Sequence, residues 1–186
     1  MIVNFIRHGK TAGNIERRFI GSTDQPLCEE GRRELEGIAY PDCDIVVASP
    51  MLRCMQTAGI IYPGKKQFVY DGLRECGFGI FEGKRHPELE GDPVYEKWIA
   101  NNGMTAPPGG EDVDGFRERC AEGFLRAVRE NGECCAISFV VHGGTIMSVL
   151  ERFAVPHREF YEYITDNGRG YITEFDGEKL TVTGKI

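Results

Sequence analysis

Short apolar runs recur along the chain and are separated by longer, more polar stretches. Five of these runs have the length and the β-branched or aromatic content typical of strands: Ile2–Ile6, Ile45–Ala48, Phe68–Tyr70, Ala136–Val141 and Tyr171–Phe175. The fourth run is almost entirely apolar, which predicts a central strand that is buried on both faces.

Two of the intervening stretches have the pattern of helices. Ser49 and Pro50 resemble an N-cap and a first helical residue, and they open a helix predicted to end at Ile60. Three residues are predicted to lie on one face of this helix: Leu52, Met55 and Gly59. A second helix is predicted between Glu111 and Gly132, because apolar residues recur there at steps of three and four: Val113, Phe116, Cys120, Phe124 and Val128.

Strands that alternate with helices of this length predict an α/β fold on a mostly parallel sheet. The length of 186 residues favours a single domain over residues 1–186. We expect a small lid-like excursion around residues 84–110, because Asn101–Gly110 is rich in Gly and Pro. Ligands of such sheets bind beyond the carboxyl ends of the strands, so a functional site is expected at that edge.

The overall composition is that of an ordinary globular protein. Apolar residues make up 41% and charged residues 27% of the chain, and no run approaches the roughly 20 apolar residues that a membrane span needs. Arg7 and His8 interrupt the apolar start, and no basic segment precedes it, so we expect no export signal. We therefore expect a cytoplasmic protein with no membrane partner.

Charge and cysteine content argue against two further classes. The net charge of −7 makes a nucleic-acid partner unexpected, because binding to phosphate backbones depends on many Lys and Arg contacts. The seven cysteines include no C-x-x-C pair, so we expect reduced thiols rather than a zinc site or a complete disulfide framework. Any anion site must therefore be built locally, from a few basic residues.

Two of the four histidines come directly after predicted strands. The first strand runs into Arg7, His8 and a glycine, and the central strand runs into His142 and Gly143. Either histidine by itself is more often structural than catalytic. Together with glycines that let backbone approach a ligand, and with an arginine fork that matches phosphate oxygens, they point to an anion site.

Two more charged residues are predicted at the same edge of the sheet. Arg53 falls in the first turn of the helix after the second strand, although an arginine there is by itself more often solvated. Glu75 follows the third strand in a glycine-rich loop. Shielding of its carboxyl by Phe78 or Phe81 would raise its pKa enough for it to act as an acid.

These residues follow the motif order of a known family: the chain resembles the histidine phosphatase superfamily, also called the phosphoglycerate-mutase-like family. The signature R-H-G-x-T-x-x-N and the stretch after it are matched by Arg7, His8, Gly9, Thr11, Asn14, Gly21, Asp24, Pro26, Leu27 and Gly31. Later motifs are matched at 49–58, 75–83, 108–111 and 142–144. The resemblance covers most of the chain and implies a three-layer α/β/α sandwich with a mostly parallel central sheet.

The resemblance also implies roles for individual residues. His8 is expected to attack phosphorus and become a phosphohistidine, and Glu75 to protonate the leaving alkoxide and then activate water. The phosphoryl oxygens are expected to be held by four side chains: Arg7, Asn14, Arg53 and His142. Thr23 and Gly143 are expected as further substrate contacts. No metal or other cofactor is expected, because arginines and a second histidine supply the positive charge.

The same core motifs also occur in mutases, which move phosphate between hydroxyls of phosphoglycerate. Mutases of the family usually carry a longer, more basic insertion after the acid, whereas here only a short excursion precedes Pro107, which favours water as the acceptor. A catalytically silent binding module is a second alternative, although the nucleophile and the acid are both present. A two-histidine metal site is a third, but no further ligand follows at a recognisable spacing.

The expected partner is a small phosphorylated metabolite, and the sequence does not define it further. Four positions depart from the family pattern without replacing a catalytic residue: Lys10, Cys28, Asp112 and Val141. Basic residues in or near the motif loops are candidates for leaving-group contacts, although most such residues are solvated: Lys10, Arg17, Arg18, Arg74, Lys84, Arg85 and His86. The chain resembles both the α-ribazole phosphatase branch and generalist phosphatases, and its oligomeric state is not predicted.

Overall fold

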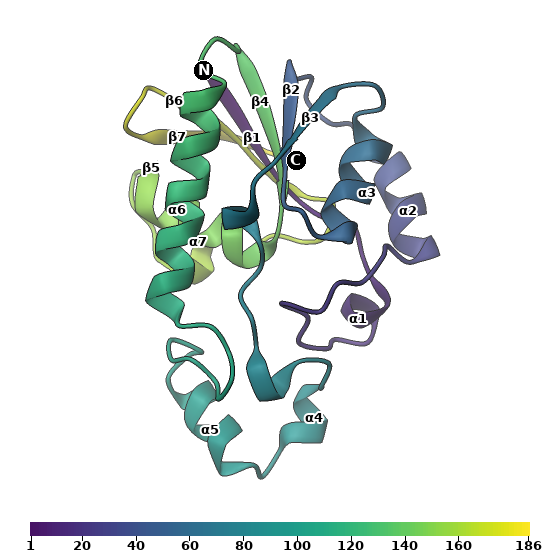
Figure 1. Cartoon of the computed structure of the whole chain (residues 1–186), viewed down its shortest axis with the longest axis vertical. Helices are drawn as coiled ribbons and strands as arrows, with labels where there is room; N and C mark the ends of the chain where they lie inside the picture. Colours follow the sequence, from purple (N-terminus) through teal and green to yellow (C-terminus); the bar gives the residue numbers. More distant parts are fainter.

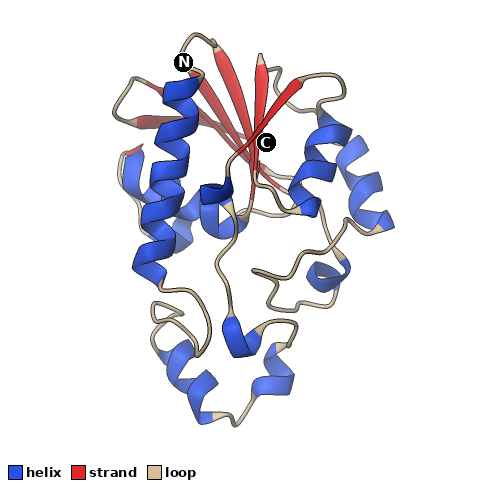
Figure 2. Ribbon diagram, viewed as in Figure 1, coloured by secondary structure: helices blue, strands red, loops and turns tan.

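A twisted seven-stranded sheet lies at the centre of the molecule (Figures 1 and 2). In the computed structural model, which describes residues 1–186, the strand order is β3-β2-β4-β1-β6-β7-β5. The strands are β1 (Ile2–Arg7), β2 (Ile45–Ala48), β3 (Lys66–Val69), β4 (Ala136–Val141), β5 (Ala154–Val155), β6 (Gly170–Phe175) and β7 (Leu180–Lys185). Strands β3, β2, β4 and β1 pair in parallel, and β6 runs antiparallel to both β1 and β7. The sheet is therefore mostly parallel, as predicted.

Helices cover both faces of this sheet. They are α1 (Ala12–Ile15), α2 (Glu29–Glu36), α3 (Leu52–Ile61), α4 (His86–Leu89), α5 (Pro93–Ala100), α6 (Val113–Glu130) and α7 (Gly143–Phe153). Short 3₁₀ turns occupy Asp71–Leu73, Gly79–Phe81 and Phe160–Tyr163. No helix is both long enough and apolar enough to cross a membrane.

Alternate residues of the central strands supply the cores on the two faces. In β4, Phe139 packs in the larger core with Phe124 of α6, while Val140 packs in a second core with Cys54 of α3. Successive strand side chains point to opposite faces, so a strand covered on both sides needs apolar residues at nearly every position. This arrangement confirms the predicted central strand and the three-layer α/β/α architecture.

All five predicted strands are present, with ends that differ by one or two residues, but β5 and β7 were not predicted. Strand β5 has only two residues, and most of β7 is exposed, with Leu180 as its buried member. A strand that buries so little apolar surface leaves only a weak hydrophobic pattern in the sequence.

Helix α3 begins two residues later than predicted, and its buried residues are not those of the predicted apolar face. The helix begins at Leu52 rather than Pro50, and the Ser49 hydroxyl bonds to His142 instead of capping it. Leu52 is 40% exposed, whereas Arg53 is fully buried and faces the sheet with its helical neighbours. The polar bonds of Arg53 determine this orientation, and a hydrophobic pattern does not report them.

The segment 84–110 carries α4 and α5, and it lies at the end of the molecule opposite the N-terminus (Figure 1). A small core of Phe81, Leu89 and Tyr95 holds it together. The chain just before the segment meets its far end where the amide of Ile80 donates to the carbonyl oxygen of Pro108 at 3.0 Å. We refer to residues 84–110 as the lid segment, and its action as a lid stays a prediction.

Candidate active site

The carboxyl ends of β1, β2 and β4 lie side by side, and each is followed by a motif residue. Arg7 of β1 is paired with Val141 of β4, so His8 and His142 emerge next to each other. The centroids of their rings are 5.2 Å apart. Parallel pairing thus joins two motifs that lie far apart in the sequence.

His8 has one ring nitrogen bonded and the other free. Its Nδ1 lies 2.7 Å from the carbonyl oxygen of Gly9. A carbonyl oxygen can only accept, so Nδ1 carries the proton and Nε2 keeps its lone pair. Burial, followed by the charges of Arg53 and Arg7, lowers the pKa of His8 well below its usual range. The ring is therefore neutral at physiological pH, with Nε2 able to act as a nucleophile.

Arg53 is a fully buried cation without an acidic partner. Its terminal nitrogens Nη1 and Nη2 donate to the carbonyl oxygens of Thr23 and Gly21, each at 2.9 Å. Neither Arg53 nor Arg7 takes part in any ion pair of the structure. A buried charge that lacks a counter-ion favours binding of an anion beside it.

His142 lies between Arg53 and Ser49. Its Nδ1 accepts from Nε of Arg53 at 3.3 Å, and its Nε2 donates to the Ser49 hydroxyl at 2.8 Å. Burial, with His8 and Arg53 nearby, lowers the pKa of His142 well below its usual range, which is consistent with a neutral ring. His142 therefore orients Arg53 in this structure. A bond from His142 to a phosphoryl oxygen stays a prediction.

Arg7 has an unused donor next to the first turn of α7. Its Nη1 donates to the carbonyl oxygen of Thr165 at 2.8 Å, but its Nε is buried without a partner. A side chain at Gly143 would place Cβ 3.5 Å from that Nε, so the guanidinium lies against the helix terminus. A buried free donor beside backbone amides of a helix start is suited to an anion.

The carboxyl of Glu75 is held by two backbone amides. Its Oε1 accepts from the amide of Cys76 at 3.0 Å, and its Oε2 from the amide of Gly144 at 3.1 Å. Burial nevertheless raises the pKa of Glu75 above its usual value. Phe78 lines the same cavity as Glu75, whereas Phe81 packs in the core of the lid segment. Of the two predicted shielding residues, only Phe78 is therefore in place.

Asn14 and Thr23 are held differently from each other. Oδ1 of Asn14 accepts from the amide of Thr11 at 3.0 Å, which leaves its Nδ2 to donate to a ligand. The Thr23 hydroxyl instead donates to Glu82 at 2.7 Å, while its carbonyl oxygen accepts from Arg53. Thr23 thus supports Arg53, and the substrate contact expected of its side chain stays a prediction.

A cavity of about 400 Å³ opens beside Arg7, Glu75 and Gly143. Eleven of its 17 lining residues are apolar, and they include six aromatic side chains: Phe19, Phe78, Trp98, Phe116, Phe160 and Tyr161. Arg7 is the only cation among the lining residues, and Glu75 is the only anion. The cavity is therefore apolar except at the end where the catalytic candidates lie.

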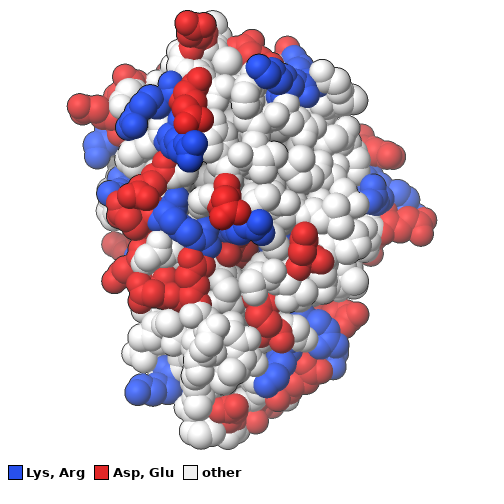
Figure 3. All heavy atoms as spheres, viewed as in Figure 1, with Lys and Arg blue, Asp and Glu red and all other residues white.

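The basic residues proposed as leaving-group contacts do not line this cavity. Lys10 instead pairs with Glu34 at 2.6 Å, and Arg74 pairs with Asp71 at 2.5 Å. Charged side chains of both signs are interspersed on the face shown in Figure 3. No group of three or more His, Cys, Asp or Glu side chains is arranged to bind a metal ion.

Comparison with known proteins identifies the family. Residues 3–185 match the family model described as histidine phosphatase superfamily, branch 1. The chain belongs to this superfamily. Its membership confirms the prediction of a histidine phosphatase made from the order of the motifs.

Three relatives illustrate the similarity. "Phosphoglycerate mutase-like protein 4" of Arabidopsis thaliana is 31% identical, over 95% of this chain and 81% of the relative. The "Adenosylcobalamin/alpha-ribazole phosphatase" of Salmonella typhimurium is 24% identical, over 88% of this chain and 85% of the relative. The crystal structure of the alpha-ribazole phosphatase from Shigella flexneri has a TM-score of 0.86 at 22% identity, covering 98% of this chain and 94% of that one. This last likeness bears on the fold alone.

The histidine phosphatase site is held together by residues that the sequence analysis did not select. The carboxylate of Glu82 accepts from the amides of Gly21, Ser22 and Phe78, which joins the loop under Arg53 to the loop after Glu75. These amide bonds outweigh burial and lower the pKa of Glu82. Glu82 lies inside the acid-bearing motif, so its motif position was the available signal.

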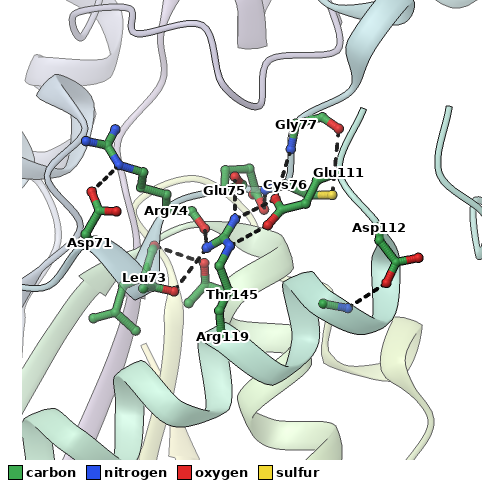
Figure 4. A network of polar contacts seen from close by, with 12 residues as sticks. Asp71, Leu73, Arg74, Glu75, Cys76, Gly77, Glu111, Asp112, Arg119 and Thr145 are labelled. Carbon is green, nitrogen blue, oxygen red and sulfur yellow. Dashed lines mark hydrogen bonds and ion pairs between the residues drawn. The ribbon is translucent and has the colours of Figure 1, made fainter. Parts of the chain in front are cut away.

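Arg119 of α6 is the second such residue (Figure 4). It pairs with Glu111 and donates to carbonyl oxygens of the segment that carries Glu75. Glu111 ends the P-G-G-E turn and could have been selected for that reason. Arg119 stands among other polar helix residues, where a sequence pattern gives no sign of an inward role.

Proposed function

We propose that this histidine phosphatase hydrolyses monoesters of a small phosphorylated metabolite through a phosphohistidine on His8, with Glu75 as the general acid and base. The observation that carries the proposal is the pairing of a neutral His8, whose Nε2 is free, with two arginines that lack counter-ions. Phosphoryl transfer is catalysed mainly by positioning and by neutralising the charge of the transferred group, and this pocket supplies both.

In the first half-reaction, Nε2 of His8 forms a bond to phosphorus as the bond from phosphorus to the ester oxygen breaks. Arg7, through its free Nε, and Arg53 neutralise the charge on the phosphoryl oxygens. Asn14 contributes a neutral donor through Nδ2. The leaving oxygen takes the proton of Glu75, so the alcohol departs neutral and Glu75 becomes a carboxylate.

In the second half-reaction the carboxylate of Glu75 takes a proton from water, and the water oxygen attacks the phosphohistidine. The bond from phosphorus to Nε2 breaks, and inorganic phosphate is released with His8 neutral again. The raised pKa of Glu75 favours the protonated form that the first step needs. The two amides of Cys76 and Gly144 hold the carboxyl in place for both steps.

Water is favoured over a second metabolite as the acceptor because the cavity has no further positive charge. A phosphoglycerate carries a carboxylate besides its phosphate, and that group would need its own cation when buried. The basic residues near the motif loops point elsewhere, since Lys10 is paired with Glu34 and Arg18 with Glu16. The apolar lining also suggests a bulky, uncharged leaving group.

The names of the relatives are divided between a mutase-like protein and phosphatases, so the assignment to hydrolysis depends on the cavity. A silent binding module is less well supported, because the chain retains His8, Glu75 and both arginines together. We also propose that the protein works in the cytoplasm without membrane or nucleic-acid partners. Its seven free cysteines and its charge of −7 support this proposal.

The test compares three esters of similar alkoxide leaving groups: 2-phenylethyl phosphate, ethyl phosphate and 3-phosphoglycerate. We expect inorganic phosphate from the first two, with the phenylethyl ester preferred, and no release by a His8→Ala variant. Formation of 2-phosphoglycerate from 3-phosphoglycerate faster than phosphate is released would favour the mutase. A folded protein that binds these esters but turns over none would be a binding module.

A further inference from the structure

Arg119 uses all of its hydrogen-bond donors at the base of the acid-bearing segment (Figure 4). Its Nε and Nη2 bind the two carboxylate oxygens of Glu111, at 2.5 and 2.7 Å. Its Nη1 donates to the carbonyl oxygens of Gly72 and Arg74, at 3.0 and 2.7 Å, and Nη2 donates to the carbonyl oxygen of Glu75 at 3.1 Å. A guanidinium has five N–H donors, so each of them has a partner here.

The segment that these bonds hold lies directly on α6. A side chain at Gly72 would place Cβ 3.0 Å from the carbonyl oxygen of Arg119 and 3.4 Å from the Cα of Gly123. Glycine lets the two backbones approach this closely without displacing their neighbours. The backbone that leads to Glu75 is thus pressed against the helix and bonded to it.

Glu111 fixes the other side of Glu75. Its amide donates to the carbonyl oxygen of Gly77 at 2.9 Å, and its Oε2 accepts from the amide of Gly77 at 3.4 Å. Together with Arg119, it therefore holds the backbone both at Glu75 and two residues beyond it. Glu111 also ends the turn that closes the lid segment, so one ion pair joins the lid base, α6 and the acid loop.

We propose that Arg119, paired with Glu111, is a positioning residue that holds the carboxyl of Glu75 at the leaving-group oxygen. The inference rests on the role of Glu75 under the proposed function. Arg119 acts through the backbone, because the carboxyl oxygens of Glu75 are bonded to the amides of Cys76 and Gly144 instead. A positive charge alone would not hold this backbone in place. The planar guanidinium does so because it donates to several acceptors at once.

The first test is the Arg119→Lys variant, which keeps the charge but cannot reach several acceptors from one fork. We expect turnover of an alkyl ester, 2-phenylethyl phosphate, to fall about 10- to 100-fold, with little change in KM. The burst of nitrophenolate, which reports phosphorylation of the enzyme by p-nitrophenyl phosphate, should slow much less, because that leaving group needs little protonation. Arg126→Ala is the matched control: Arg126 is on the same helix, exposed, and paired only with Glu130. It should change neither rate.

The second test removes Glu75 itself. In a Glu75→Gln background, Arg119→Lys should cause almost no further loss with the alkyl ester, because residues that act as one unit are not additive. If Arg119 had a purely structural role, Arg119→Lys would lower the phosphorylation rates with both esters equally. Its effect would also add to that of Glu75→Gln. Either result would overturn the proposal.

A milder substitution, Glu111→Gln, guards against misfolding of Arg119→Lys. It keeps the shape of the side chain and removes the charge that orients Arg119, so the same selective loss is expected at smaller size. An unchanged ratio of the alkyl to the aryl phosphorylation rate in folded Glu111→Gln would also overturn the proposal. If Glu75→Gln alone left the alkyl ester unaffected, the proposed acid would be wrong as well, which separates the two failures.

Discussion

At the scale of single residues, the site depends on positive charges that have no acidic partner. Arg53 and Arg7 help to lower the pKa of His8, while burial raises the pKa of Glu75. The proposed nucleophile is therefore kept neutral, and the proposed acid is kept protonated to a higher pH than an exposed glutamate. Two titratable groups whose pKa values are shifted in these directions are suited to nucleophilic attack and proton donation.

The Glu75→Gln variant tests the acid. With an alkyl ester the turnover is expected to fall by roughly 10²- to 10⁴-fold, as is typical of a lost proton transfer. With p-nitrophenyl phosphate the first step should fall less, because nitrophenolate departs without a proton. Steady-state and burst kinetics with both esters measure the difference. Equal losses of the phosphorylation step for the two esters would remove Glu75 as the acid.

The buried histidines predict how stability depends on pH. In the unfolded chain a histidine takes up a proton as the pH falls through about 6.5, whereas folded His8 and His142 stay neutral to lower pH. The unfolded state then binds more protons, so the free energy of unfolding falls as the pH drops through that range. The raised pKa of Glu75 acts in the opposite direction, above its ordinary value of 4.5.

Urea unfolding at about pH 7.5 and about pH 5.5 measures this loss. We expect His8→Gln to lose less stability between these two values than the wild type, because one proton-linked group has been removed. If both proteins lost the same free energy of unfolding between the two pH values, His8 would not be held neutral by the fold.

The sequence was sufficient to select His8, Arg53 and Glu75, because each lies in a short motif just after a strand. It could not select Arg119, which is separated from Glu75 by a whole segment and is brought to it only by the packing of α6. Nor could it show that His142 bonds to Ser49. Contacts between distant segments depend on the fold, and local patterns do not contain them.

At the scale of elements, a close backbone contact joins the chain before the lid segment to the end of that segment. Gly79 has a φ of +51°, and a Cβ there would lie 2.2 Å from the carbonyl oxygen of Pro108. Gly83 also has a positive φ, +75°, but a Cβ there would meet nothing within 4 Å. The two glycines therefore separate the cost of backbone conformation from the cost of a clash.

We expect Gly83→Ala to lower the free energy of unfolding by about 1–2 kcal/mol, the cost of a left-handed residue with a side chain. Gly79→Ala should cost clearly more, because its Cβ also pushes the lid ends apart. Urea unfolding of the two variants gives the comparison. Equal losses would show that the contact between Gly79 and Pro108 is not tight.

Helices with a regular apolar repeat could be predicted from the sequence. The buried face of a helix that carries a buried polar side chain could not. The pattern of Phe116, Cys120 and Phe124 identified α6, whose buried face contains all three. For α3 the same reasoning selected Leu52, yet the helix buries Arg53. The buried guanidinium of Arg53 is held by polar bonds to Gly21, Thr23 and His142, and a hydrophobic pattern does not report such bonds.

At the scale of the whole molecule, parallel strands bring the catalytic candidates to one edge, and aromatic residues from several elements line the cavity beside them, with Trp98 contributed by the lid segment. Two arginines supply the positive charge at this edge, and no cluster of side chains is arranged there to bind a metal ion. We therefore expect turnover of p-nitrophenyl phosphate to survive dialysis against EDTA. A rate abolished by EDTA and restored by a divalent ion would contradict this part of the account.

The proposed mechanism requires a covalent intermediate at His8, and trapping this intermediate tests the mechanism directly. The wild type and Glu75→Gln are mixed briefly with p-nitrophenyl phosphate and analysed by acid-free mass spectrometry. We predict one added phosphoryl group on His8, longer lived in Glu75→Gln because its hydrolysis lacks a base, and none in folded His8→Ala. Phosphorylation of the His8→Ala protein, or turnover by this variant at the wild-type rate, would contradict the role of His8 as the nucleophile.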